Sequence, residues 1–267
     1  MIGRKRMSEI GQLLQHRPRP LIDPHNRMIV IFSAKAASRS LVIWFWHHLG
    51  HLQAAHDYST WPHRYRNDVY YKSELYRAAC RSDLSDYKVI RVVRDPYDRA
   101  ISMYRHALRH GLIDNLAERW RRFRGTGPQF SFADFLGRLE RTNLPAGNPH
   151  FRVQRHPVED RLRAHFTIDV SRENLLERLA GIESELGLPP SNLSQSPWMR
   201  TQSRLDRRNA EHPLDVYNHP FTPAETRFGW PRYEAFLTDE ARQRIAKLYD
   251  LDIRTYFQPP TLDRLQP

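Results

Sequence analysis

The stretch that decides the fold is MIVIFS-AKAASRS-LVIWFW, which covers residues 28–33, 34–40 and 41–46. Its first part is a short apolar run rich in β-forming residues, which is typical of a strand buried on both faces of a sheet. A small polar loop follows, and then an apolar run that predicts a helix ending at Gly50. A strand that passes through a short loop into a helix is the beginning of a parallel α/β unit.

A second unit of the same kind starts at residue 87. The run YKVIRVV over 87–93 predicts a strand, and Asp95-Pro96 follows it directly after Arg94. Asp is a preferred N-cap and Pro a preferred first helical residue, so we expect a helix from there to about Arg109, before Gly111. The sequence therefore contains two successive strand-to-helix turns.

Later segments continue the alternation of strands and helices. The pattern predicts a helix over 132–141 capped by Ser131, a strand over 165–170, a helix capped by Ser171 and stopped by Gly187, and a last helix over 238–249. This order favours an α/β sandwich with a central parallel β-sheet flanked by helices. We expect one domain over 1–267, in which residues 1–27 are a polar lead-in.

Composition limits the class of protein. The chain has 267 residues, a formal net charge of +12 and one cysteine, Cys80. A lone cysteine excludes a disulfide framework and favours a reducing, cytoplasmic location. The apolar runs are too short to cross a bilayer, and the basic N-terminus lacks the apolar core of a signal peptide.

The positive charge comes mainly from arginine, since only five of the 42 basic residues are lysines. Arginine pairs with phosphate and sulfate through two hydrogen bonds, which favours an anionic partner. The large number of arginines is also explained by a biased amino-acid composition together with a solvated surface. The densest cluster, RWRRFR over 119–124, mixes aromatic residues with arginines that can stack on bases or sugars.

The loop after the first strand has the features of an anion site. At the carboxyl end of a parallel strand, backbone N–H groups and the dipole of the next helix attract a phosphate. Ala36, Ala37 and Ser38 let the backbone approach a ligand, Lys35 adds a charge, and Ser40 adds a hydroxyl. The nucleoside triphosphatase loop GxxxxGK[ST] is different, because it has glycines and a late lysine followed by Ser/Thr.

The second unit offers another anion clamp. Arg94 stands at the end of the strand, and Ser102 follows eight positions later on the helix, where Arg99 shares its face. Each clamp alone is also compatible with an ordinary capped helix that carries surface arginines. The two together are much more specific.

At these two motifs the sequence resembles the PAPS-dependent sulfotransferases, most closely the carbohydrate-type branch. AKAASRSL over 34–41 resembles the family loop for the 5′-phosphosulfate, and RDPYDRAISMY over 94–104 resembles the family motif for the 3′-phosphate. NPHFRVQ over 148–154 and LYDLDIRTYF over 248–257 are similar to two further family segments. The resemblance implies a P-loop-type sandwich and transfer of the sulfuryl group of PAPS to a hydroxyl of a carbohydrate or glycolipid.

The resemblance also implies roles for individual residues. Lys35 is expected to stabilise the bridging oxygen of the departing phosphate, and His56, in the loop AAHDYSTWPH over 54–63, is expected to be the general base. Asp57, His63 and His150 are the alternatives for the base. The residues expected to bind PAPS are Lys35, Ala36, Ala37, Ser38, Arg39, Ser40, Arg94 and Ser102. Residues 111–160 are expected to form an insertion on the acceptor side.

Three departures from the family pattern concern the motifs. Arg39 stands where Ser or Thr is usual, Ala34 where Pro is usual, and Phe151 where Trp is usual. The membrane anchor and the cysteines of the animal relatives are missing, which indicates a soluble bacterial-type enzyme. Position alone suggests that Arg200 and Arg204 close over the donor or the acceptor.

Other functions remain as alternatives. They are an ATP- and Mg²⁺-dependent P-loop phosphotransferase, a non-catalytic nucleotide-binding relative, and a nucleic-acid-binding protein, although no specific nucleic-acid motif is present. No metal is expected, because the HxxxH pairs at 47/51 and 106/110 lack further ligands. The sequence leaves open the acceptor, which its arginines suggest is anionic, together with the oligomeric state and peripheral attachment to an anionic membrane.

Overall fold

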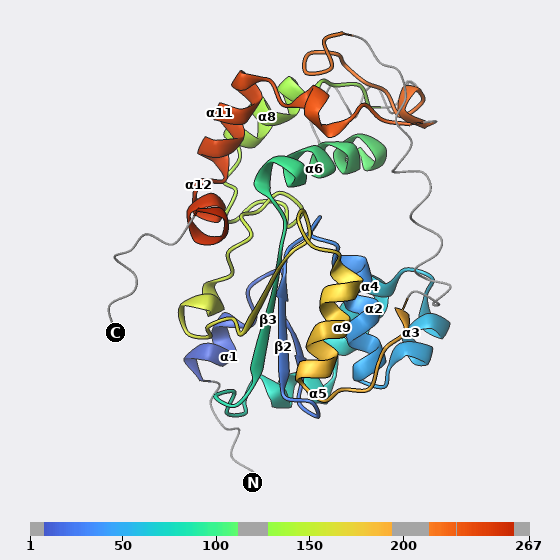
Figure 1. The fold of residues 1–267 in the computed structure, drawn as a ribbon, viewed down its shortest axis with the longest axis vertical. Coiled ribbons are helices and arrows are strands. Elements are labelled where there is room, and N and C mark those ends of the chain that lie inside the picture. The colour runs from blue at the N-terminus through green and yellow to red at the C-terminus, as the bar shows by residue number, and fades with distance from the viewer. Residues whose placement is uncertain (1–7, 112–127, 194–213, 228, 259–267) are drawn as a thin grey trace. The chain divides into compact units, whose positions relative to one another are not determined.

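The computed structural model describes residues 8–111, 128–193, 214–227 and 229–258 (Figure 1). The chain divides into two compact units. Unit 1 consists of Met1–Val93 and His156–Ser203, and unit 2 consists of Arg94–Arg155 and Arg204–Pro267. Two compact units can belong to one domain, so the expected single domain over 1–267 stays a prediction.

Unit 1 is built on a four-stranded sheet in the order β1-β2-β3-β4. Strands β2 (Met28–Phe32), β3 (Lys88–Val93) and β4 (Phe166–Asp169) are parallel, whereas β1 (Leu21–Asp23) pairs antiparallel with β2 at the edge. The three strands predicted from the sequence are therefore confirmed. Every residue of β2 is buried, as expected of a strand covered on both faces.

Helices cover both faces of this sheet. Figure 1 shows α2 (Ser38–His48) and α9 (Leu175–Glu185) on one side and α1 (Glu9–Leu13) on the other. Between α2 and β3 the chain forms α3 (Leu52–Tyr58), α4 (Pro62–Asp68), η1 (Tyr70–Lys72) and α5 (Glu74–Ala79), and η2 (Pro157–Asp160) precedes β4. The predicted α/β sandwich with a mostly parallel central sheet is confirmed.

The first 27 residues do more than lead into the fold. Ser8 caps α1 by accepting a hydrogen bond from the amide of Gly11, and β1 extends the sheet with three buried residues. The hydroxyl of Tyr70 accepts a hydrogen bond from the amide of Ile22 at 2.8 Å and donates one to the carbonyl of Ile22 at 2.6 Å. The segment 1–27, predicted as a polar lead-in, thus contains a helix and a strand; the strand was not predicted, because three residues between prolines are too few to show a period.

Unit 2 has a core of its own, in which Tyr104 packs against several aromatic rings. Its main helices are α6 (Pro96–His110), α8 (Phe132–Glu140) and α11 (Asp239–Leu248). Its short elements are η4 (Glu225–Arg227), η5 (Tyr233–Phe236), α12 (Asp250–Asp252) and η6 (Ile253–Phe257). Residues 112–127 of the predicted insertion 111–160 lie outside the described residues.

Most helix ends agree with the caps predicted from the sequence. Asp95 and Ser131 are the N-caps of α6 and α8, as predicted, whereas Thr238, the first residue of the helix predicted over 238–249, is the N-cap of α11. The cap of α9 is Asn174 and not Ser171, because the chain makes a turn over 170–173 before the helix begins.

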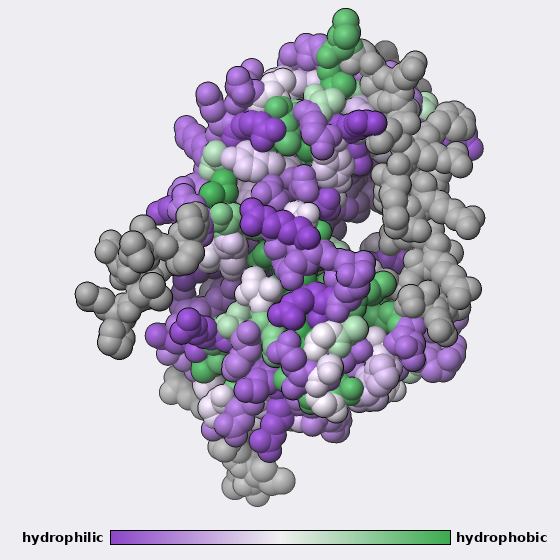
Figure 2. Space-filling view, viewed as in Figure 1, coloured by the Kyte–Doolittle hydropathy of each residue, from purple (hydrophilic) through white to green (hydrophobic). Residues whose placement is uncertain are grey.

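The described residues include no helix with the length and apolar character needed to span a membrane. Figure 2 shows hydrophilic residues over much of the face that it presents, in keeping with a charged fraction of 27%.

Candidate functional site

The loop between β2 and α2 is turned by residues with left-handed backbone conformations. Lys35 has φ 69° and Ala37 has φ 51°, whereas Ala36 between them does not have a positive φ. Such alternation is how glycine-free loops turn successive N–H groups toward one side, where they form a concave anion site. The loop thus achieves without glycine what glycines usually supply.

The amino end of α2 points its free amides at this loop. The N-cap, Ala37, makes no side-chain capping bond, and the first helical hydrogen bond runs from the amide of Leu41 to the carbonyl of Ala37 at 3.2 Å. The amides of Ser38, Arg39 and Ser40 therefore have no acceptor within the helix. Together with the helix dipole they favour an anion.

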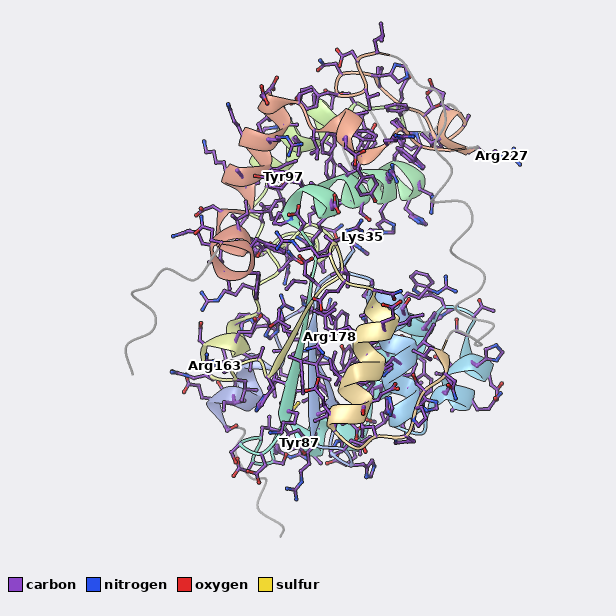
Figure 3. All side chains as sticks on the ribbon, in the orientation of Figure 1. Lys35, Tyr87, Tyr97, Arg163, Arg178 and Arg227 are labelled. Atoms are coloured by element: carbon purple, nitrogen blue, oxygen red, sulfur yellow. The ribbon has the colours of Figure 1, made fainter. Side chains whose placement is uncertain are left out.

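Lys35 lies beside these amides. Figure 3 shows it at the end of the sheet where β2 finishes, and it shows Tyr87, which precedes β3, at the opposite end. Lys35 is partly exposed, whereas Ala36 and Ser33 are buried. The loop therefore packs against the core through its small residues and presents its lysine at the surface of unit 1.

Arg39 has a more specific environment than a surface arginine. Its guanidinium carbon lies 5.6 Å from the centre of the Trp61 ring, which precedes α4. Its buried Nε has no hydrogen-bond partner among the described residues. Partial burial lowers the pKa of Arg39. Because the ordinary pKa of arginine is very high, the guanidinium keeps its positive charge. The arginine thus adds a second positive charge beside Lys35 at the start of α2.

The expected general base, His56, lies on α3 and not in a loop, so that prediction of local structure was wrong. The stretch AAHDY completes a helix that begins at Leu52. The His56 side chain is 52% exposed, and its Nδ1 lies 3.8 Å from Oδ1 of Asp57, which also accepts a hydrogen bond from Gln53.

The two remaining base candidates fall in different units. His63 lies on α4 with its ring 5.1 Å from that of Trp61. His150 belongs to unit 2, where its ring lies 4.6 Å from that of His106 on α6. His56 and Asp57 thus lie on α3 and His63 on the next helix, α4, of unit 1, whereas His150 belongs to unit 2.

Unit 2 holds the second predicted motif at the start of α6. Asp95 Oδ1 accepts hydrogen bonds from the amides of Tyr97 at 2.8 Å and Asp98 at 3.4 Å. At the other end Gly111 adopts φ 58° and ends the helix, as expected. Ser102, in the middle of α6, is partly buried.

Arg94, directly before this cap, is held at three points. Its amide donates to the Gln154 side-chain oxygen at 3.0 Å, and its carbonyl accepts from the Gln154 side-chain nitrogen at 2.8 Å. Its guanidinium donates to the hydroxyl of Tyr233 at 3.2 Å and lies 5.6 Å from the centre of that ring. The sequence pointed to Gln154 only through the resemblance of 148–154, and it gave no signal for Tyr233.

Arg99, which shares the helix with Ser102, has a structural position. It is fully buried, donates to the carbonyl of Arg152 at 2.6 Å, and lies 3.8 Å from Oδ2 of Asp252. Its guanidinium also lies 5.5 Å from the centre of the Tyr249 ring. It therefore contributes to the core of unit 2, and Arg94 is the arginine of this motif that is partly exposed.

Several other predicted features carry no site in the described residues. The described part of the chain contains no group of three or more His, Cys, Asp or Glu side chains arranged to hold a metal ion. The arginine cluster 119–124, Arg200 and Arg204 lie outside the described residues.

A comparison with models of protein families identifies the family to which the chain belongs. The model of the sulfotransferase family matches residues 19–258, nearly the whole described chain. The chain belongs to the sulfotransferase family. Neither the comparison with curated proteins nor the comparison with solved structures found a match.

Membership in the sulfotransferase family makes the protein an enzyme of sulfuryl transfer, for which this family generally uses PAPS. It also confirms the P-loop-like fold expected for the sheet and its helices. Both motifs, over 34–41 and 94–104, fall inside the matched residues.

Proposed function

We propose that this sulfotransferase moves the sulfuryl group of PAPS to a hydroxyl of a carbohydrate or glycolipid acceptor by in-line, metal-independent transfer. The observation that carries the proposal is the loop over 33–40, in which a buried parallel strand, two positive φ angles and the open end of α2 present amides and Lys35 to an anion. The family match supplies the reaction class.

In this proposal the donor is held at both of its charged ends. Lys35, Ala36, Ala37, Ser38, Arg39 and Ser40 bind the 5′-phosphosulfate, and Arg94 with Ser102 binds the 3′-phosphate. Amides at a helix start and a guanidinium are groups that recognise phosphate oxygens. The tethered Arg94 supports its part of the assignment: its backbone is held by Gln154 and its guanidinium by Tyr233, so the side chain loses less freedom when a phosphate binds.

Lys35 is proposed to stabilise the transition state. In sulfuryl transfer the S–O bond to the 5′-phosphate breaks while the acceptor oxygen bonds to sulfur, so negative charge grows on the bridging oxygen. A lysine ammonium and helix amides fixed around that oxygen lower the barrier, because they are already in place when the charge develops. No metal ion is required for this step.

The proton of the acceptor hydroxyl needs a base, and we propose His56. Its imidazole is half exposed on α3 and has the Asp57 carboxylate 3.8 Å from Nδ1. Asp57, His63 and His150 remain the alternatives. A pH–rate profile of His56→Ala is expected to lose the rise of activity between about pH 5 and 8 that a histidine base produces. A profile that keeps this rise would transfer the role to one of the alternatives.

The acceptor is proposed to be anionic, since the chain carries a net charge of +12 and Arg39 stacks on the partly exposed Trp61. Trp61 and Tyr58 are exposed large aromatic side chains, a type that packs against sugar rings. We propose a cytoplasmic location on the basis of the single buried Cys80, and peripheral contact with an anionic membrane for a glycolipid acceptor.

The test compares two nucleotide ligands and two single lysine variants. Adenosine 3′,5′-bisphosphate without metal is expected to raise the melting temperature, whereas ATP with Mg²⁺ is expected to raise it less. Lys35→Ala is expected to lower kcat by about a hundredfold or more while the fold is unchanged. Lys88→Ala is the matched control, since Lys88 is exposed at the start of β3, and it should keep wild-type kcat.

Each outcome has a meaning. Stabilisation by ATP with Mg²⁺ alone would favour the P-loop phosphotransferase, and binding of the bisphosphate without turnover on any sugar would favour a non-catalytic nucleotide-binding protein. Binding that is restricted to DNA or RNA and falls steeply with salt would favour the nucleic-acid function. Near-normal kcat in Lys35→Ala would remove Lys35 from the mechanism.

A further inference from the structure

A fully buried carboxylate lies at the end of α12 in unit 2. Asp252 accepts hydrogen bonds from the amide of Gln154 at 2.7 Å (Oδ1) and 2.9 Å (Oδ2), and from the amide of Arg155 at 3.2 Å. Its Oδ2 also lies 3.8 Å from the guanidinium of Arg99, which is equally buried. A buried charge is costly unless it is paired and hydrogen-bonded, so this carboxylate holds its partners in one geometry.

The partner that matters is Gln154. The carboxylate of Asp252 fixes the backbone amide of Gln154. The side-chain amide of Gln154 bonds to both the N–H and the C=O of Arg94. Gln154 is 2% exposed and Asp252 is 0% exposed, so both are shielded from solvent. The chain of contacts from Asp252 through Gln154 therefore ends on the backbone of a partly exposed arginine.

The backbone of Arg94 determines where its guanidinium begins. The hydroxyl of Tyr233 then receives that guanidinium at 3.2 Å, so the side chain is held at its root and near its tip. An arginine has several rotatable bonds, and fixing its root removes part of the conformational entropy that ligand binding would otherwise cost. The contacts with Gln154 and with Tyr233 thus hold the Arg94 side chain in place before a ligand binds.

We propose that Asp252 and Gln154 are positioning residues that hold Arg94 to recognise the 3′-phosphate of the donor. This inference rests on the proposed function, in which Arg94 binds that phosphate. Neither residue touches the donor, because both act through the backbone of Arg94. Their consequence is selectivity: the enzyme distinguishes a 3′-phosphorylated adenosine from one without that phosphate.

The test measures this selectivity as a ratio. Calorimetric titration gives the Kd of adenosine 3′,5′-bisphosphate and of adenosine 5′-monophosphate, which lacks the 3′-phosphate. For Asp252→Asn and for Gln154→Met we expect the preference for the bisphosphate to fall about tenfold, the effect of an ordered hydrogen bond to a charged group. The Kd of the monophosphate should change little, since that ligand does not use Arg94.

Glu140→Gln is the matched control. Glu140 pairs with Arg244 at 2.7 Å in the same unit, and the other hydrogen bonds of Arg244 in the described residues go to Tyr217 and Glu240. This variant removes an ion pair and should leave the ratio of the two Kd values at the wild-type level. Thermal melts confirm that each variant is folded, and if Asp252→Asn does not fold, Gln154→Met decides.

The results separate this inference from the proposed function. A wild-type protein that does not prefer the bisphosphate would contradict the proposed donor site itself. A wild-type preference that Gln154→Met retains would overturn the positioning role alone. An equal loss of affinity for both nucleotides in the variants would also overturn it, because that pattern indicates general damage to unit 2.

Discussion

The carboxylate of Glu183 joins α9 to α2, the helix that follows the loop over 33–37. It is buried and accepts hydrogen bonds from the indole N–H of Trp44 at 2.6 Å and the amide of Ser191 at 3.2 Å. Nε2 of His48, whose side chain is 0% exposed, lies 3.1 Å away. Three polar groups of unit 1 thus depend on one side chain.

Replacing Glu183 with Gln should destabilise the protein by about 3 kcal/mol. A hydrogen bond to a charged group contributes about 1.5–3 kcal/mol, and the Glu183 carboxylate accepts two of them, from Trp44 and from Ser191. The lower end applies because Gln keeps the shape and one acceptor oxygen. Glu185→Gln is the control: Glu185 is on the same helix, its side chain is 54% exposed, and it pairs with Arg178 at 3.4 Å. That change should cost less than about 0.5 kcal/mol.

The pH dependence of this cluster has a definite sign. Burial lowers the pKa of His48, so only the unfolded chain takes up the proton as the pH falls below about 6.5, and stability decreases there. Burial alone would raise the pKa of Glu183, but hydrogen bonds from Ser191, Trp44 and His48 outweigh it and lower the pKa. The carboxylate therefore stabilises the fold above about pH 4.5, and that contribution is lost as the pH falls through its lower folded-state pKa.

Urea unfolding followed by tryptophan fluorescence at pH 7.5 and at pH 4 measures both effects. We expect the midpoint of Glu183→Gln to fall at pH 7.5 with an unchanged m-value, and its deficit to shrink at pH 4. A free energy of unfolding within about 0.5 kcal/mol of the wild type at pH 7.5 would refute the reasoning, since Trp44 and His48 would then not depend on the charge.

Three further changes test other parts of unit 1. Arg39→Ser, which restores the hydroxyl usual in the family, should raise the Kd of adenosine 3′,5′-bisphosphate about tenfold in calorimetry; an unchanged Kd would place Arg39 outside the donor site. Ala37→Val should lower the free energy of unfolding by about 2 kcal/mol, because a β-branched residue resists φ 51°, whereas Ala37→Gly should be neutral or stabilising by up to about 1 kcal/mol. Tyr70→Phe should cost about 2 kcal/mol, because it leaves both backbone groups of Ile22 unpaired. Tyr87→Phe is the control: the Tyr87 hydroxyl makes no hydrogen bond with the described residues, so this change should cost less than about 0.5 kcal/mol.

Local signals in the sequence predicted the elements that position the site. The apolar run over 28–33 and the Asp95-Pro96 pair each act within a few residues, so the strand β2 and the start of α6 follow from them. The same holds for the capping box of Ser131 and Asp134 at α8. Where a cap or a buried strand specifies the structure, the neighbouring residues are sufficient to predict it.

Features that depend on tertiary packing were missed. β1 is a strand because Tyr70 satisfies its backbone, and this partner is 48 positions away in the sequence. The sequence predicts a loop around His56, because only Leu52 of the seven residues LQAAHDY is a large aliphatic residue and the segment lacks a clear apolar stripe. The left-handed backbone angles of Lys35 and Ala37 could not be predicted from the sequence either, because neither residue is a glycine.

The separation of Arg94 from the residues that secure it has a consequence for the order of folding. The loop over 33–37 closes between neighbours in the chain, whereas Tyr233 is 139 positions from Arg94 and Asp252 is 98 positions from Gln154. Contacts between such distant residues form slowly, since a long segment must first be brought together. We therefore expect a refolding chain to form the loop over 33–37 before the contacts that hold Arg94, and, if both elements bind the donor as proposed, nucleotide affinity should be among the last properties that it recovers.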